Sequence, residues 1–184
     1  MQQDTLNYTT PADLRDRIPD SDLIQLTTDG DEEPSDEDTF LDSAVTYAGD
    51  PTTTASEVEE KVGRIIRSAL LHGEGRVNSR VGVAYRLPAK APDGTVPSEI
   101  EDAVLVLAEE KIRNRRPRRT RRSGAAQKSD IEVRADEVRE WLTAVSRGQA
   151  IIARLDKTGA EEDAKPGAAF GIGNRSSRRF NSSW

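Results

Sequence analysis

The apolar residues between Val58 and Tyr85 recur at three- and four-residue intervals, and this spacing limits the possible folds more than any other feature of the chain. Residues spaced in this way share one face of an α-helix, whereas a strand would need them at every second position. Ser56 and Glu59 have the spacing of a helix capping box. The sequence therefore predicts a helix of about thirty residues over 57–87. Its apolar face consists of Val58, Val62, Ile65, Ala69, Leu70, Gly73, Val77, Val81 and Tyr85.

Three glycines, Gly73, Gly75 and Gly82, interrupt this predicted helix. Each costs about 1 kcal/mol relative to alanine inside a helix, so we expect a kink or the close packing of another helix near Gly73. The single histidine, His72, lies beside it, and the chain has no cysteine. Without a second histidine or a cysteine to share a metal ion, we expect His72 to be a surface or packing residue.

Shorter helical patterns precede the long one. The residue types at Thr10 and Pro11 are typical of a helix start, which predicts a helix ending near Arg17. One further helical turn is predicted over 21–26. A third helical face is then broken by residues 47–56. That face consists of Phe40, Leu41, Ala44 and Val45.

Two more helices are predicted after the long one. Ser98 and Glu101 have the spacing of a second capping box, which opens a helix that Pro117 ends. A last helix is predicted over 130–147, because Gly148 is a typical helix stop. The inward residues of these two helices are Ile100, Val104, Leu107, Ala108, Ile112, Val138, Trp141, Leu142 and Val145.

These patterns predict an all-α protein: a small helical bundle with one long helix, an acidic N-terminal loop region and an extended C-terminal arm. The chain has 184 residues, which suits one domain with a modest core. The acidic loop region covers 29–38. Apolar residues become sparse after Leu155, so we expect the helical domain to comprise residues 1–155 and the arm residues 156–184.

Charge is distributed unevenly along the chain. Residues 1–60 contain seventeen aspartates and glutamates but only Arg15 and Arg17 as basic residues, whereas the whole chain has a net charge of -6. The remainder is therefore basic. This distribution is explained either by solubility and local helix-end preferences, or by a subunit whose acidic face meets a neighbour's basic face in an assembly.

The most basic segment places seven arginines within ten residues: Arg113, Arg115, Arg116, Arg118, Arg119, Arg121 and Arg122. Cations are favoured at a helix C-terminus, so the block is compatible with a solvated loop. It is also compatible with a contact to an acidic protein surface or to DNA phosphates. No aromatic residue lies among the arginines to stack on a base, and no recognition helix follows. Between the two partners, we therefore favour protein.

The C-terminus ends in RRFNSSW, which places Phe180 and Trp184 beside arginines. Exposed aromatic side chains are costly in water, and aromatic residues with arginine are typical anchors of protein interfaces. The two side chains either pack on the chain's own helices or insert into a partner. We favour insertion into a partner.

The sequence offers no convincing enzyme site. No serine, histidine and aspartate in catalytic order surround His72, and the Gly171-Ile172-Gly173 stretch lacks the third glycine of a dinucleotide loop. We therefore expect no catalytic activity, cofactor or metal. No apolar run approaches the roughly 18 residues of a membrane span, so we expect no membrane partner.

Several segments, taken in order, resemble the Mu-like phage head-tail joining proteins. They are TTPADLRDRI, SDLIQLTTDGD, a long helix ending in AYRLP, a helix that runs into an arginine-rich loop, and DEVREWLTAVSRGQ. The resemblance covers roughly residues 7–155, together with a tail that ends in Arg-Phe and a terminal aromatic residue.

This resemblance implies an all-helical head-tail connector, or adaptor, that forms a dodecameric ring beneath the phage portal protein. Such a ring continues the channel for packaged DNA towards downstream neck or tail proteins. It would lie in the neck of the virion after assembly in the host cytoplasm. The C-terminal arm of such connectors docks on the portal, and Trp141 would belong to the bundle core. The docking residues here would be Arg178, Arg179, Phe180, Asn181 and Trp184.

Two alternatives stay open at this point. The arginine block is compatible with a DNA-binding module that ignores base sequence, whose affinity would fall steeply with salt. The chain is also compatible with another ring component of the neck or tail, either a stopper or a tail terminator.

Overall fold

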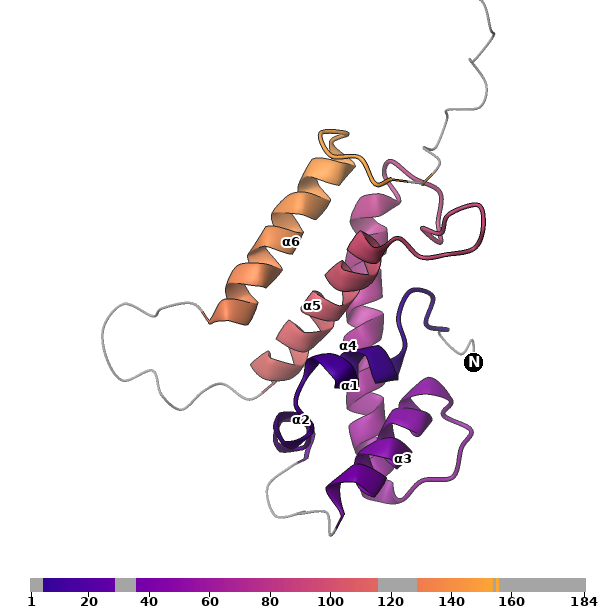
Figure 1. Cartoon of the computed structure of the whole chain (residues 1–184), viewed down its shortest axis with the longest axis vertical. Coiled ribbons are helices and arrows are strands. Elements are labelled where there is room, and N and C mark those ends of the chain that lie inside the picture. Colours follow the sequence, from indigo (N-terminus) through magenta and orange to yellow (C-terminus); the bar gives the residue numbers. More distant parts are fainter. Residues whose placement is uncertain (1–4, 29–35, 116–128, 154, 156–184) are drawn as a thin grey trace, which may run out of the picture.

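The computed structural model describes residues 5–28, 36–115, 129–153 and 155. Within these residues the chain forms six α-helices and no β-strand, which confirms the all-α prediction (Figure 1). The helices are α1 (Pro11–Arg17), α2 (Asp20–Thr27), α3 (Glu37–Gly49), α4 (Glu57–Val81), α5 (Ser98–Asn114) and α6 (Asp130–Ser146).

Helices α4 and α5 form the centre of the bundle. The longest helix, α4, has 25 residues and runs the height of the molecule, with α5 beside it (Figure 1). All residues of α5 from 103 to 109 are buried, so this helix is covered on nearly every side. A helix that is apolar on nearly all of its faces is typically buried in the middle of a core.

The two central helices approach closely at Gly73. A Cβ atom added there would lie 2.5 Å from the carbonyl oxygen of Val104 in α5. Gly63 likewise allows α3 to approach α4 closely, because a Cβ atom at position 63 would lie 2.7 Å from the carbonyl oxygen of Ala44 and 2.9 Å from the ring of Tyr47. The expected close packing near Gly73 is therefore confirmed.

Two apolar clusters meet along the central pair. The first joins the C-terminal half of α4 to α5 and α6, and the second joins the N-terminal half of α4 to α1, α2, α3 and the end of α5. Trp141, which the resemblance places in the bundle core, is partly buried and packs against the first cluster. Fully buried members include Val77, Val81, Tyr85, Ile100 and Val104 in the first cluster, and Leu14, Leu23, Leu41, Ile66 and Leu70 in the second.

Both ends of the described chain are attached to the long helix or the turn that follows it. The carboxylate of Glu74, which is 3% exposed, accepts hydrogen bonds from the backbone amides of Asn7 and Tyr8 at 2.7 and 2.9 Å. At the other end, the hydroxyl of Tyr85 accepts a hydrogen bond of 2.9 Å from the amide of Ile152. A buried carboxylate is stable only when such donors replace water.

Several helix ends follow the sequence pattern. Capping boxes form at Thr10 for α1 and at Ser56 for α4, and each side chain accepts a hydrogen bond from the third residue of its helix. The turn after α6 places Gly148 at a φ of 70°, a conformation that side chains with a Cβ rarely adopt. The predicted helix at 21–26 is also present, as α2.

Three predicted boundaries are wrong. Helix α3 continues to Gly49, because Tyr47 and Ala48 are buried against α4. Helix α4 ends at Val81 instead of residue 87, since the chain turns back and places the Leu87 side chain against Gly82. The capping box predicted at Ser98 does not form.

The start of α5 has a simple physical reason. Pro97 occupies the N-cap position with an extended backbone, and Ser98 is already the first helical residue. The carbonyl oxygen of Pro97 accepts hydrogen bonds from the amides of Ile100 and Glu101.

The predicted C-terminal arm, residues 156–184, lies outside the described residues, whereas Leu155 packs against the first cluster.

We predict that Gly73→Ala destabilises the protein and Gly75→Ala does not. The first substitution places a Cβ against backbone that must move, and overpacking of this kind costs about 1–3 kcal/mol. A Cβ at position 75 meets nothing within 4 Å, so Gly75→Ala should stabilise the helix by up to about 1 kcal/mol. Urea unfolding followed by circular dichroism measures both, and equal effects would contradict the role of Gly73.

Candidate functional site

The structure describes two of the predicted site residues, Arg113 and Arg115, which lie at the C-terminal end of α5. The other predicted site residues lie outside the described residues. They are Arg116, Arg118, Arg119, Arg121 and Arg122 of the arginine block, and Arg178, Arg179, Phe180, Asn181 and Trp184 of the arm.

Arg113 forms part of an ion-pair network inside the molecule. Its Nε atom donates to Glu109 at 2.8 Å, and the other carboxylate oxygen of Glu109 accepts from the Nε atom of Arg17 at 3.2 Å. The Glu109 side chain is only 8% exposed, so two guanidinium groups compensate for the burial of its charge. The network ties α1 to α5, and Arg113 also lies 3.8 Å from Asp22 of α2.

Arg115 caps the end of α2. Its Nη1 atom donates to the carbonyl oxygens of Leu26 and Thr27, at 3.2 and 2.9 Å. The last carbonyl groups of a helix lack partners within the helix and carry its negative dipole end, so a guanidinium group is favoured there. Both described arginines of the block therefore contact this chain's own helices. Their predicted contact with protein or DNA stays a prediction.

A groove of about 1100 Å³ opens between α4, the C-terminal end of α5 and α6. We call it the basic groove, because five cationic side chains line it beside only three carboxylates. The cationic residues are Lys61, Arg64, Lys111, Arg115 and Arg139, and the acidic residues are Glu57, Glu60 and Glu110. Ile65, Ala69 and Ile112 add an apolar part to the lining.

His72 lies in the basic groove. Partial burial lowers the pKa of His72, and the nearby charges of Lys111 and Arg76 lower it further. Burial also lowers the pKa of Lys111, whose amine donates to the Ser68 carbonyl and hydroxyl at 2.8 and 3.0 Å. The cationic side chains that line the groove outnumber the carboxylates, so the groove carries a local excess of positive charge in a protein whose net charge is negative.

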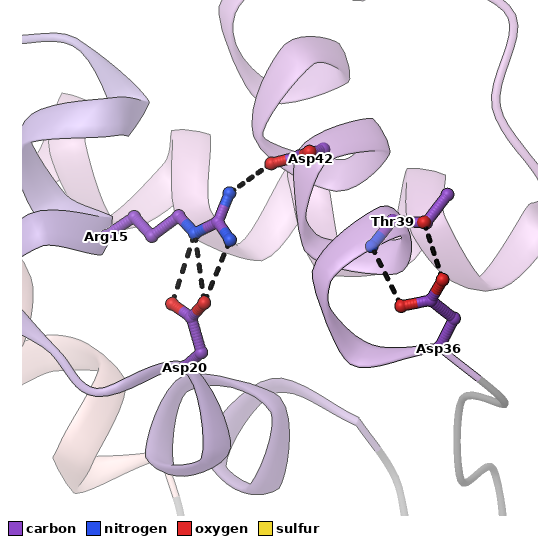
Figure 2. Close-up of polar contacts among 5 residues, drawn as sticks. All are labelled: Arg15, Asp20, Asp36, Thr39 and Asp42. Carbon is purple, nitrogen blue, oxygen red and sulfur yellow. Dashed lines mark hydrogen bonds and ion pairs between the residues drawn. The ribbon is translucent and has the colours of Figure 1, made fainter.

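A second charged surface lies at the start of α3. We call it the acidic edge, and it consists of Asp36, Glu37, Asp38 and Asp42, all exposed. Asp36 caps α3 by accepting hydrogen bonds from the Thr39 amide and hydroxyl, and the hydroxyl bond in particular lowers the pKa of Asp36 (Figure 2).

Arg15 fixes the acidic edge to the rest of the bundle. Its guanidinium group pairs with Asp20 of α2 at 2.8 Å and with Asp42 of α3 (Figure 2). One α1 side chain thus joins three helices. The hydrogen bond from Arg15 lowers the pKa of Asp20, more than burial raises it.

The described residues contain no group of three or more His, Cys, Asp or Glu side chains suited to hold a metal ion. None of the helices in this part of the chain has both the length and the apolar character needed to cross a membrane. The two buried carboxylates described, Glu74 and Glu109, are each bound by groups of the chain itself.

The sequence did not reveal the basic groove. Its residues come from three helices, and Lys61 and Arg139 are far apart in the chain. A partial signal exists in α4, where Arg64, Ser68 and His72 follow one another at four-residue intervals and therefore share one face.

We predict that Arg15→Gln lowers stability at neutral pH but not in acid. A carboxylate whose pKa is lowered in the folded state contributes stability above its unfolded pKa, and this contribution is lost as the pH falls through the folded value. The free energy of unfolding should drop by about 0.2–1 kcal/mol at pH 7, and the difference should vanish as the pH falls well below about 4. Urea unfolding across this range measures it. A pH-independent difference, or the same profile in the exposed control Lys90→Gln, would contradict the prediction.

Comparison with known proteins identifies the family. A family model described as Bacteriophage Mu, Gp36 matches residues 8–170, which include all six helices. No curated protein and no solved structure matches the chain. Because the family match spans most of the sequence, the chain belongs to the Bacteriophage Mu Gp36 family and is a phage protein.

Proposed function

We propose that this phage protein is a head-tail connector that forms a ring beneath the portal protein and continues the DNA channel to the tail. One observation carries the proposal. This helical bundle of a phage family has charged surfaces of opposite sign, the acidic edge and the basic groove, and such complementary surfaces favour the head-to-tail contacts that repeat around a ring. A dodecameric ring is the assembly we expect, located in the neck of the virion after assembly in the host cytoplasm.

The proposed role is structural and not enzymatic. The buried carboxylates Glu74 and Glu109 bind amides and guanidinium groups of the chain, which assigns them to stability. The network around Glu109 also accounts for Arg113, one of the arginines predicted to contact a partner. The proposal therefore relies on protein surfaces and not on a reactive group.

Contact with the portal is assigned to the end of the chain. Phe180 and Trp184 are aromatic residues beside Arg178 and Arg179, the residue types that anchor interfaces. The downstream partners are neck or tail proteins, and packaged DNA passes through the channel.

We predict that Phe180→Ser with Trp184→Ser abolishes binding to portal rings of the same phage. Loss of two aromatic anchors removes the apolar part of the contact. The mass of the complex formed from portal rings and purified chain measures binding. The chain truncated after Ala168 should behave like the double variant, whereas the control Phe170→Ser, an aromatic residue outside the terminal motif, should bind like the parent chain. Failure of the full-length chain to add mass would refute the proposed function.

We also predict that replacing Arg116, Arg118 and Arg119 by serine weakens ring or portal binding and leaves DNA retention unchanged. The matched control replaces Arg80, Arg86 and Arg147, which are exposed and do not line the basic groove. Complex mass and filter binding to duplex DNA at several salt concentrations separate the outcomes. Unchanged assembly with lost DNA retention would assign the block to DNA, because phosphate contacts give a steep salt dependence.

A further inference from the structure

The basic groove and α3 border different faces of α4 and meet at Arg64, which lines the groove and donates to the Tyr47 hydroxyl of α3 at 3.4 Å. Gly63 and Arg67 face α3, since Gly63 packs against Ala44 and Arg67 donates to the Ala48 carbonyl oxygen at 2.8 Å. Ile65 and His72 line the groove. Each is about half a helical turn from Gly63, because successive residues rotate by about 100°. In Figure 1, α3 lies beside the lower half of α4, away from α6. No described residue of α3 lines the groove, so the acidic edge of one copy does not occupy that copy's own groove.

The groove lining is suited to a protein segment rather than to DNA. Glu57, Glu60 and Glu110 would repel phosphates, and Ile65 and Ile112 offer apolar contact that a DNA backbone does not use. The cations nevertheless exceed the carboxylates in number, so the complementary segment is acidic.

The acidic edge has the required charge and accessibility. It is part of the first two turns of α3, and Glu37 and Asp38 are exposed in its first turn. Asp36 accepts hydrogen bonds from Thr39, which favour its charged form. The C-terminal end of the chain is a poorer match, because Arg175, Arg178 and Arg179 would meet like charges in the groove.

We infer that the basic groove of one copy receives the acidic edge of α3 from a second copy of this chain. The contact is head-to-tail, since the two surfaces are different. Such heterologous contacts generate a ring when the rotation between copies closes. The inference deepens the proposed function and rests on it for the closed ring, but the contact between two copies is tested without the portal.

Cysteine trapping tests this contact, because the natural chain has no cysteine. One preparation carries Arg64→Cys in the groove, where the parent side chain is 68% exposed, and another carries Asp38→Cys in the acidic edge. After mixing and mild oxidation, we expect the disulfide-linked heterodimer to exceed both homodimers. The matched control pairs Arg64→Cys with Glu137→Cys, an exposed acidic position on α6. A yield no greater than that of the control overturns the inference.

A charge exchange provides the second measurement. Adding Glu37→Lys to the Asp38→Cys chain should lower the heterodimer yield, and adding Lys61→Glu to the Arg64→Cys chain should restore it. Restoration requires that the two substituted surfaces face each other, so loss of yield without restoration overturns the contact. Higher salt should lower the yield of the unmodified pair.

The two proposals fail in different ways. If the heterodimer forms but the chain adds no mass to portal rings, the connector role is refuted, whereas the contact between the groove and the acidic edge is supported. Portal binding without heterodimer formation refutes the contact alone. If Lys61→Glu instead reduces affinity for duplex DNA and leaves the heterodimer yield unchanged, the groove binds DNA and the inference is wrong.

Discussion

The contact between Gly73 of α4 and the carbonyl of Val104 of α5 is the constraint on which the rest of the bundle depends. The absence of a side chain at position 73 lets the backbones of α4 and α5 approach each other closely. Both apolar clusters lie along this helix pair. Helix α6 packs against the pair in the first cluster, and helices α1 to α3 pack against it in the second. A looser pair would leave gaps in both clusters, and interiors tolerate gaps poorly.

Ion pairs then fix the short helices to this centre. Glu109 of α5 receives Arg17 of α1 and Arg113 from its own helix, while Arg115 caps α2. The acidic N-terminal region is thus held by arginines, two of which come from the start of the arginine block. The acidic edge of α3 and the basic groove are separate charged surfaces, and they are the basis of the proposed head-to-tail contact.

Much of the fold was predictable because its signals are local. The capping box at Ser56 and the stop at Gly148 depend on residues within one turn, and the structure confirms both. The predicted extension of α4 to residue 87 was wrong, because an apolar residue in helical register also packs well from a turn that folds back, as Tyr85 does. The capping box at Ser98 failed because Pro97 accepts the first helical hydrogen bonds.

The sequence by itself determined the helical class, most helix positions and the separation of acidic from basic segments, and it predicted either a kink or close packing near Gly73. Only the tertiary structure decided that Arg113 and Arg115 hold α1 and α2, and that side chains from three helices form one groove. The reason is physical. Periodicity and capping act within a few residues, whereas the neighbours of a side chain on another helix depend on how the helices pack, which no short stretch of sequence encodes.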